Sequence, residues 1–306
     1  MTRIGIVITH PDTFPAADPE LDSLPLIAAL GRHGAHAEQL VWHDESVDWT
    51  SFDLVVLRSP WDYPQRPAEF EAWLDRAAAL TRVLNEPALV RWNMDKRYLE
   101  QLEAAGIPGV PTTYCSDVDS LERALSAASS AGDAVGGADG TAHLVLKPAV
   151  GAGAQQTGLF AHGDPAALAL GREILAGGGT VMLQPEVPEL SEGHEKALYL
   201  VDGCFTHAIA KGALLARGGG LRGRTYLERP VVVEATEEEK QFAERVLAAV
   251  SQVTDLPTPL YGRIDVVDSA RFGLVLLEAE LFEPLFNLPL VPEVTETFAE
   301  TILARV

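Results

Sequence analysis

The chain has 306 residues, of which 47% are apolar and 22% are charged, proportions typical of a soluble globular protein. Its 23 basic and 44 acidic residues give a net charge of −21, which argues against nucleic acid or an anionic membrane as a partner. No segment approaches the ~20 apolar residues of a membrane span. The two cysteines, Cys115 and Cys204, are too few for a disulfide framework, so we expect a cytoplasmic protein.

The first part of the chain alternates between short apolar runs and amphipathic segments. Such alternation predicts a small parallel α/β domain. The expected strands are Ile4–Thr9, Ala37–Trp42, Leu54–Leu57 and Val83–Leu84, and the expected helices are Leu24–His33 and Phe70–Ala79.

The rest of the chain predicts a mixture of helices and antiparallel strands. Asp202-Gly203, between Lys196–Val201 and Cys204–Ile209, is the strongest hairpin signal. Ser129–Thr141 is rich in small residues and predicts a mobile loop. The remaining expected helices are Lys96–Ala105, Leu121–Ala128, Glu237–Val253 and Val294–Arg305, and the remaining extended segments are Val110–Tyr114, Leu144–Lys147, Thr180–Gln184, Leu260–Val267 and Leu274–Glu280.

Two of these strands carry acidic residues in an apolar setting. Side chains alternate along a strand, so Arg263 and Asp265 share one face, as do Glu278 and Glu280. If the strands pair through the turn near 268–272, the two faces coincide. Three carboxylates together need a counter-charge, and such oxygen ligands suit magnesium. The alternative is a pair of strand ends with solvated acids.

Two further segments have features of a nucleotide site. Lys147 ends an apolar strand and precedes a turn that contains Gly151 and Gly153, which can place an ammonium group and backbone amides beside phosphate oxygens. Gln184-Pro-Glu186-Val187-Pro follows an expected strand and continues as an extended segment, which can present backbone groups to an adenine. A carboxylate a few residues later can accept hydrogen bonds from ribose hydroxyls. Each signal alone is weak, and for Lys147 alone a surface lysine is the simpler interpretation.

Taken in chain order, these motifs resemble those of the ATP-grasp ligases, over most of residues 85 to 285. Gln184–Val187 with Glu195-Lys196 resembles the glutathione synthetase branch, and Arg263 to Glu280 resembles the metal site of D-alanine–D-alanine ligase. The resemblance implies an ATP-grasp architecture, in which an N-terminal parallel α/β domain (1–95) precedes an α+β lid (96–186) and a C-terminal α+β subdomain with the metal site (187–306).

The resemblance also implies a role for each matching residue. ATP and Mg²⁺ would be the cofactors, Arg263 and Lys211 the catalytic residues, and Asp265, Glu278 and Glu280 the metal ligands. Glu280 stands where many members have asparagine. Residues assigned to ATP would be Lys96, Lys147, Gly151, Gly153, Gln184, Glu186, Val187 and Glu195.

A narrower similarity links Arg58-Ser-Pro-Trp61-Asp62-Tyr63, 91–99 and 278–284 to the group that includes the cycloserine-forming O-ureido-D-serine cyclo-ligase. It implies that Arg58, Trp61, Asp62 and Tyr63 face a small amino-acid-like substrate. The alternative is an aromatic packing cluster with a structural Arg–Asp pair. Homodimers are common among such ligases. Three functions remain open: a ligase joining two molecules through an acyl phosphate, an intramolecular cyclo-ligase, and a non-catalytic nucleotide-binding protein.

Overall fold

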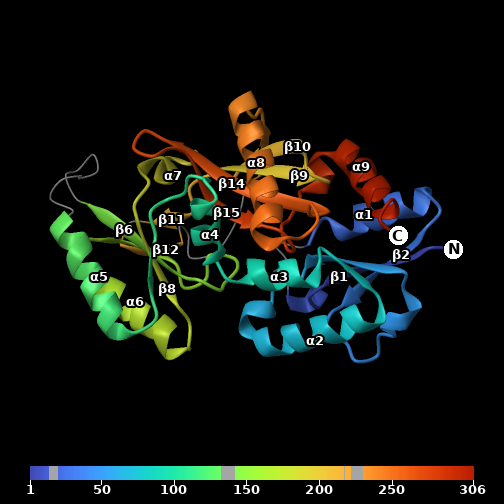
Figure 1. Cartoon of the computed structure of the whole chain (residues 1–306), viewed down its shortest axis with the longest axis horizontal. Coiled ribbons are helices and arrows are strands. Elements are labelled where there is room, and N and C mark those ends of the chain that lie inside the picture. Colours follow the sequence, from blue (N-terminus) through green and yellow to red (C-terminus); the bar gives the residue numbers. More distant parts are fainter. Residues whose placement is uncertain (14–19, 132–141, 217, 222–229) are drawn as a thin grey trace.

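The computed structural model describes residues 1–13, 20–131, 142–216, 218–221 and 230–306. The three larger β-sheets follow one another along the long axis of the molecule, and helices cover their outer faces (Figure 1). The predicted loop 129–141 begins later than expected, because helix α5 extends to Ala131, and its remaining residues lie outside the described ones.

The N-terminal sheet is parallel, as the sequence predicts, with the order β2-β1-β3-β4. Five of the six residues of β1 and all six of β3 are buried, which explains why these strands are nearly continuous apolar runs. Its strands are β1 (Arg3–Ile8), β2 (His36–Val41), β3 (Leu54–Ser59) and β4 (Arg82–Leu84), and the helices of this region are α1 (Ser23–Arg32), α2 (Pro67–Leu80) and α3 (Pro87–Met94).

The second sheet is antiparallel, with the order β5-β8-β6-β7, and the two helices α5 and α6 pack on it. Strand β7 and helix α6 are absent from the sequence-based expectations. Helix α6 begins after Asp164, which caps it by accepting a hydrogen bond from the amide of Ala166. The elements are β5 (Thr113–Cys115), α5 (Val118–Ala131), β6 (His143–Pro148), β7 (Gly158–Ala161), α6 (Pro165–Ala176) and β8 (Val181–Pro185).

The third sheet is antiparallel, with the order β13-β10-β9-β14-β15. Asp202 and Gly203 both have positive φ and connect β9 to β10, which confirms the predicted hairpin. Helix α8 starts at a capping box formed by Thr236 and Glu239. The elements are α7 (Pro188–Glu192), β9 (Lys196–Val201), β10 (Cys204–Ala210), β13 (Val231–Val233), α8 (Glu237–Thr254), β14 (Tyr261–Ser269) and β15 (Gly273–Glu280), and β11 (Leu215–Ala216) pairs with β12 (Gly219–Leu221).

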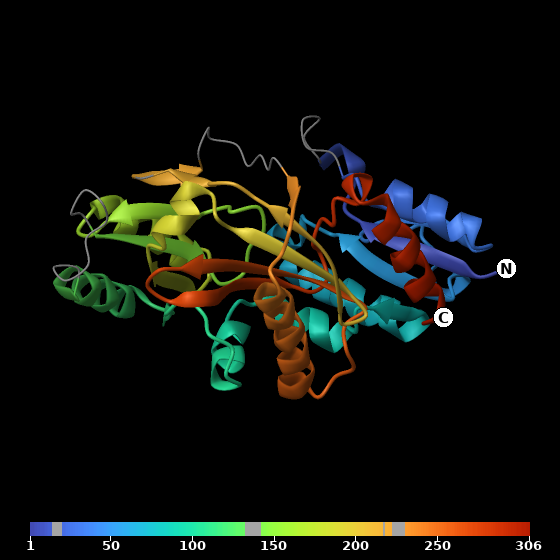
Figure 2. The same cartoon turned by 90° about the horizontal axis from the view of Figure 1, so that it is seen from above.

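Two helices connect parts that are far apart in the sequence. Helix α4 (Tyr98–Ala104) packs against α8 in the core of the C-terminal sheet. Helix α9 (Pro292–Leu303) packs against α1 of the N-terminal sheet, so the two ends of the chain lie side by side (Figures 1 and 2). The division into 1–95, 96–186 and 187–306 remains a prediction, and α4 lies with the third sheet rather than the second.

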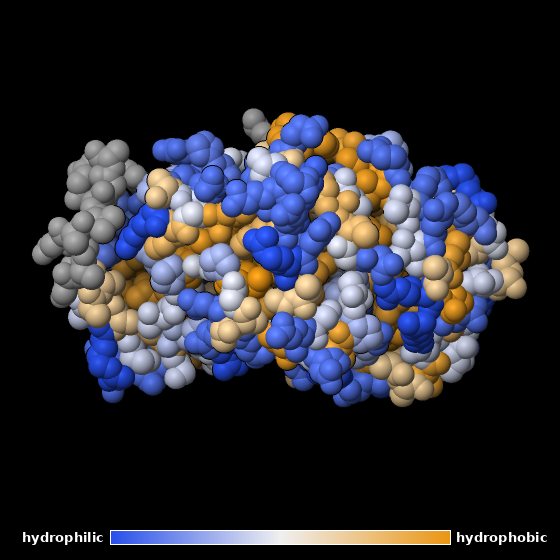
Figure 3. Space-filling model, turned by 45° about the horizontal axis from the view of Figure 1, so that its top comes forward, coloured by the Kyte–Doolittle hydropathy of each residue, from blue (hydrophilic) through white to orange (hydrophobic). Residues whose placement is uncertain are grey.

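Hydrophilic residues spread over the face shown in Figure 3, and apolar residues lie between them in separate areas. Among the described residues, no helix has the length and apolar character that crossing a membrane requires. The short 3₁₀ helices are η1 (Pro11–Thr13), η2 (Trp49–Ser51), η3 (Tyr63–Gln65) and η6 (Leu288–Leu290).

Candidate active site

A cavity of about 760 Å³ is lined by strands of the second and third sheets and by segments that follow strands of the N-terminal sheet. The second sheet contributes Lys147 and Gln184, the third Asp265 and Glu278, and the N-terminal region Trp61. Of the residues singled out from the sequence, those lining it are Trp61, Asp62, Lys96, Lys147, Gly151, Gly153, Gln184, Glu186, Val187, Glu195, Lys211, Arg263, Asp265, Glu278 and Glu280.

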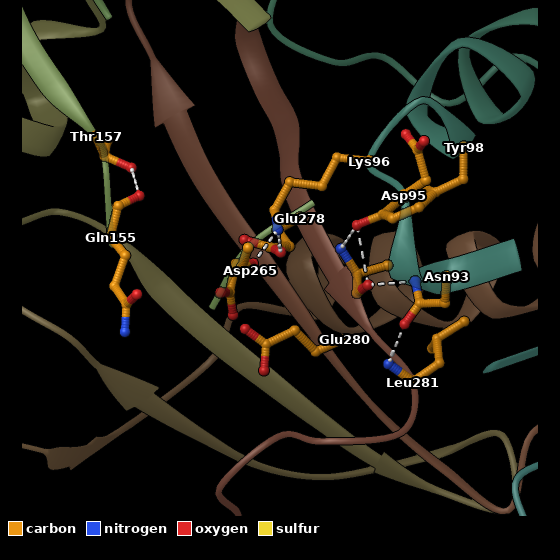
Figure 4. Close-up of polar contacts among 12 residues, drawn as sticks. Asn93, Asp95, Lys96, Tyr98, Gln155, Thr157, Asp265, Glu278, Glu280 and Leu281 are labelled. Atoms are coloured by element: carbon orange, nitrogen blue, oxygen red, sulfur yellow. Dashed lines mark hydrogen bonds and ion pairs between the residues drawn. The ribbon is translucent and has the colours of Figure 1, made fainter. Parts of the chain in front are cut away.

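The acidic strands β14 and β15 pair as predicted, with Arg263 opposite Glu280 and Asp265 opposite Glu278. Because opposite residues of a ladder project from the same face, their side chains meet. Carboxylate oxygens of Asp265, Glu278 and Glu280 all lie within 4.8 Å of one another and point to a common centre (Figure 4). This is an all-oxygen donor set of the kind that suits Mg²⁺.

Two cations hold the carboxylates in place from one side. Arg263 Nε lies 2.8 Å from Asp265 Oδ1, and its guanidinium also pairs with Glu280. Lys211 Nζ lies 3.0 Å from Asp265 Oδ2 and 3.1 Å from Glu195. Burial acts to raise the pKa of Asp265, but Arg263 and Lys211 outweigh it and lower that pKa. By contrast, burial raises the pKa of Glu280 to about 7 although Arg263 opposes the shift.

Lys96 approaches the carboxylates from the other side. Its ammonium group lies 3.0 Å from Glu278 Oε1 and donates a 2.7 Å hydrogen bond to the Gly151 carbonyl (Figure 4). Burial acts to lower the pKa of Lys96, but Glu278 outweighs it and raises that pKa. Lys147 has no ion pair within the described part of the chain, and burial lowers its pKa. It is therefore available for an anionic ligand.

The segment 184–187 leaves strand β8 at the cavity wall. The Gln184 side-chain amide donates to Thr112 Oγ1 at 2.8 Å, and the Glu186 backbone amide donates to the His143 carbonyl at 3.0 Å. A carboxylate oxygen of Glu186 lies 3.3 Å from His143 Nδ1. These contacts fix the path of the chain that was expected to meet adenine.

The structure divides the predicted substrate cluster. Trp61 and Asp62 line the cavity, whereas Arg58 and Tyr63 do not. Arg58 is only 1% exposed, lies 3.0 Å from Asp22 and stacks over the rings of Tyr261 and Phe286. The expectation that Arg58 faces the substrate is therefore wrong: the structural Arg–Asp pair describes it, because a buried guanidinium needs a buried counter-charge.

Tyr63 lies in an aromatic cluster with Phe70 and Phe282, so its placement also fits the packing alternative. Its hydroxyl interacts with Glu283, which does line the cavity. No role was predicted for Glu283 from the sequence. The available signal was an acidic residue three positions after Glu280 in an otherwise apolar segment.

The family model for the N-terminal domain of D-cycloserine synthetase DcsG matches residues 6–85. The cycloserine biosynthesis protein DcsG of Streptomyces lavendulae is 34% identical over 289 residues, which cover 94% of each chain. The crystal structure of D-cycloserine synthetase DcsG is 32% identical, covers 99% of both chains and has a TM-score of 0.87.

The crystal structure of D-alanine–D-alanine ligase from Bacillus anthracis complexed with ATP has a TM-score of 0.63 at 13% identity, covering 99% of this chain and 97% of that one. At this identity the likeness concerns the fold, which is ATP-grasp. The chain therefore belongs to the DcsG family and is an ATP-grasp ligase, an enzyme that forms carbon–nitrogen bonds with release of ADP.

Proposed function

We propose that this enzyme activates the carboxylate of a small amino-acid-like substrate as an acyl phosphate, and that its preferred substrate is O-ureido-D-serine, which it closes into a ring. The observation that carries the proposal is the arrangement of Asp265, Glu278 and Glu280 on one face of β14 and β15, beside cations and in the wall of the cavity. The 34% identity to a cycloserine biosynthesis protein supports the choice of substrate.

Magnesium fits the three carboxylates, which would hold it. The basic side chains of Arg263, Lys211 and Lys96 would balance the negative charge of the carboxylates that the ion does not. When bound, this ion would supply positive charge that offsets the negative charge developing on the transferred phosphate. Lys147 supports the phosphate assignment, because it lines the cavity and lacks an ion pair within the described residues.

In this proposal Lys147, Lys96 and the turn with Gly151 and Gly153 bind the ATP phosphates. The backbone at Glu186 and Val187, with Gln184, borders the adenine, and Glu195 accepts hydrogen bonds from the ribose. Support comes from their common cavity, in which Lys211 joins Glu195 to Asp265.

The chemistry needs a good leaving group, because a carboxylate oxygen leaves poorly when an amine attacks. Transfer of the terminal phosphate of ATP to the substrate carboxylate provides one. Arg263 then stabilises the oxyanion formed when nitrogen attacks, and Lys211 contacts the transferred phosphate. Both cations are buried and held by carboxylates, so they require little reorganisation during the reaction.

The test is ADP release with MgATP and a panel of small amino acids, dipeptides and O-ureido-D-serine. We expect ADP and a cyclic product with O-ureido-D-serine as the only added substrate. ADP release that requires two different substrates would instead establish an intermolecular ligase. The absence of ADP release with every compound of the panel would contradict the proposed substrate class.

A further inference from the structure

All but one of the acidic side chains that line the cavity lie close to a basic side chain. Seven acidic side chains line it. Six of them lie within 4.0 Å of a basic side chain: Asp62 of His43 and Arg66, Glu186 of His143, Glu195 of Lys211, Asp265 of Arg263 and Lys211, Glu278 of Lys96, and Glu280 of Arg263. Glu283 has no such neighbour in the described ranges of the chain.

The side chain of Glu283 is also buried. Its exposed fraction is 8%, and its Oε2 atom has no hydrogen-bond partner among the described residues. Burial raises its pKa to about 8, with a further contribution from Glu280. Burial disfavours the charged form of a carboxyl group that has no nearby cation, so a positively charged ligand in the cavity would stabilise the Glu283 carboxylate.

The backbone around Glu283 is held rigidly. Trp61 Nε1 donates to the Glu283 carbonyl at 2.8 Å, and Arg58 donates to the Pro284 carbonyl at 2.8 Å. The Tyr261 hydroxyl donates to the Phe282 carbonyl at 2.8 Å. Arg58 thus acts as a positioning residue for this segment, since a fixed backbone holds the carboxyl group at one place in the cavity wall.

The position of Glu283 relative to the proposed reaction centre indicates which group of the substrate it would bind. Glu283 interacts electrostatically with Glu280, Glu278 and Lys96, so it borders the carboxylate cluster. An α-amino acid carries its ammonium and carboxylate groups on the same carbon. If the substrate's ammonium group binds at Glu283, the substrate's own carboxylate therefore lies beside the cluster of Asp265, Glu278 and Glu280. This is the place where the proposed function has the substrate carboxylate phosphorylated.

We propose that Glu283 binds the α-ammonium group of the amino-acid substrate and thereby selects α-amino acids over other carboxylates. This inference rests on the proposed function, because it places the substrate carboxylate at the same cluster. Asp62, in the same cavity, is less suited to this role because its carboxylate already accepts a 2.7 Å hydrogen bond from Trp42 and lies near Arg66.

The test compares O-ureido-D-serine with 3-(ureidooxy)propanoic acid, which lacks only the α-amino group. We measure kcat/KM for ADP release by the wild type and by Glu283→Gln. The wild type should prefer the amino compound by about 100-fold, and the variant should lose at least about tenfold of that preference, the usual effect of one charge-assisted hydrogen bond. The KM for ATP should stay within about twofold, because ATP binds elsewhere in the cavity.

Glu195→Gln is the matched control, since it makes the same change among the residues assigned to ATP. It should raise the KM for ATP and leave the preference for the amino compound unchanged. Glu283→Asp keeps the negative charge, so it should retain the preference with a higher KM even if Glu283→Gln folds poorly. An unchanged preference in Glu283→Gln would overturn the inference.

Failure of the proposed substrate gives a different result. If the wild type released no ADP with O-ureido-D-serine, the assignment of that substrate would fail. The ratio of kcat/KM between an amino acid and its deaminated acid would then be measured for D-alanine against propionate, and for each amino acid of the panel that releases ADP. A preference for the amino compound that depends on Glu283 would still support the ammonium site. ADP release with the deaminated acids alone would overturn it.

Discussion

Glu278 shows how one residue can serve the structure and the proposed chemistry at once. It lies opposite Asp265 in the β14–β15 ladder, and Lys96 lies 3.0 Å from it. Burial acts to raise the pKa of Glu278, but Lys96 and Lys147 outweigh it and lower that pKa. The carboxylate therefore stays charged in a half-buried position, as a ligand for a divalent cation requires.

We predict that Glu278→Gln abolishes most ADP formation and leaves the fold intact. The amide has the same shape but lacks the charge that a magnesium ligand supplies, so the rate should fall on the order of 100-fold. ADP release and thermal unfolding of the variant measure the two effects. Glu100→Gln, on the exposed side of α4, is the matched control and should keep wild-type activity. Full turnover by Glu278→Gln would refute the metal assignment.

His207 provides a second prediction at this scale, because burial lowers its pKa to about 4. Its ring stacks on Tyr199 at 4.2 Å, and its Nε2 donates to the Phe286 carbonyl at 2.9 Å. The unfolded chain binds a proton at His207 below pH 6.5, whereas the native state does not until about pH 4. His207 should therefore lower the free energy of unfolding as the pH falls through this window, by up to about 3 kcal/mol.

Urea unfolding of the wild type and of His207→Gln at pH 7.5, 6 and 5 tests this. Glutamine keeps a hydrogen-bond donor but does not titrate. The wild type should lose more stability than the variant between pH 7.5 and pH 5. Parallel pH dependence of the two proteins would rule out a role for His207 in acid sensitivity.

At the scale of elements, β15 is an edge strand that carries two of the three candidate ligands. Side chains from the segment 93–98 satisfy its outer edge. The Asn93 amide donates to the Ala279 carbonyl and accepts from the Leu281 amide, each at 2.8 Å (Figure 4). The Tyr98 hydroxyl donates to the Ala279 carbonyl at 2.9 Å and accepts from its amide at 2.8 Å. These bonds fix the edge and with it Glu278 and Glu280.

Replacing Tyr98 with phenylalanine should therefore destabilise the protein and impair activity. The variant leaves a buried amide and carbonyl of Ala279 with fewer partners, which costs roughly 2 kcal/mol. Urea unfolding measures this loss, and the KM for MgATP should rise because Glu278 is held less firmly. In Tyr114→Phe, a half-buried control, water can replace the lost hydroxyl, so a smaller effect is expected. Equal stability of wild type and Tyr98→Phe would contradict this account.

At the scale of the whole molecule, one hydrophobic core joins the two ends of the chain. It contains Ile4 and Ile6 of β1, Tyr199 of β9, and Phe298 and Ile302 of α9, all of them buried. Helix α9 covers α1 and is the last helix of the chain. The N-terminal sheet thus shares its core with α9, which begins 208 positions after the last residue of the sheet (292 − 84 = 208).

We predict that residues 1–95 expressed alone do not unfold cooperatively, because the apolar surface that α9 covers would face water. In the full chain Phe298→Ala should lower the free energy of unfolding by about 3–5 kcal/mol, the usual cost of removing a buried phenyl ring. Denaturant titration of the fragment and of the variant tests both statements. A fragment with a sharp, two-state transition would show that the N-terminal domain has a sufficient core of its own.

Local pattern was enough to predict several features. The pairing of β14 with β15 followed from alternation and a short connection, and the β9–β10 hairpin followed from Asp202-Gly203. Arg58 could not be placed in this way, because its partner Asp22 lies 36 residues away and three aromatic rings enclose it only after folding. Strand β7, with the sequence GLFA, shows no apolar–polar alternation, and its place is set by pairing with β6 in the folded chain.

The sequence by itself determined the fold class and the types of side chain at the candidate site. It did so because strand and helix periods, turn residues and the spacing of Arg263, Asp265, Glu278 and Glu280 are local properties of the chain. Only the tertiary structure decided which charges are neutralised. It placed a basic side chain beside six of the seven acidic residues of the cavity and left Glu283 without one, because an ion pair depends on distances between segments that meet only when the sheets assemble.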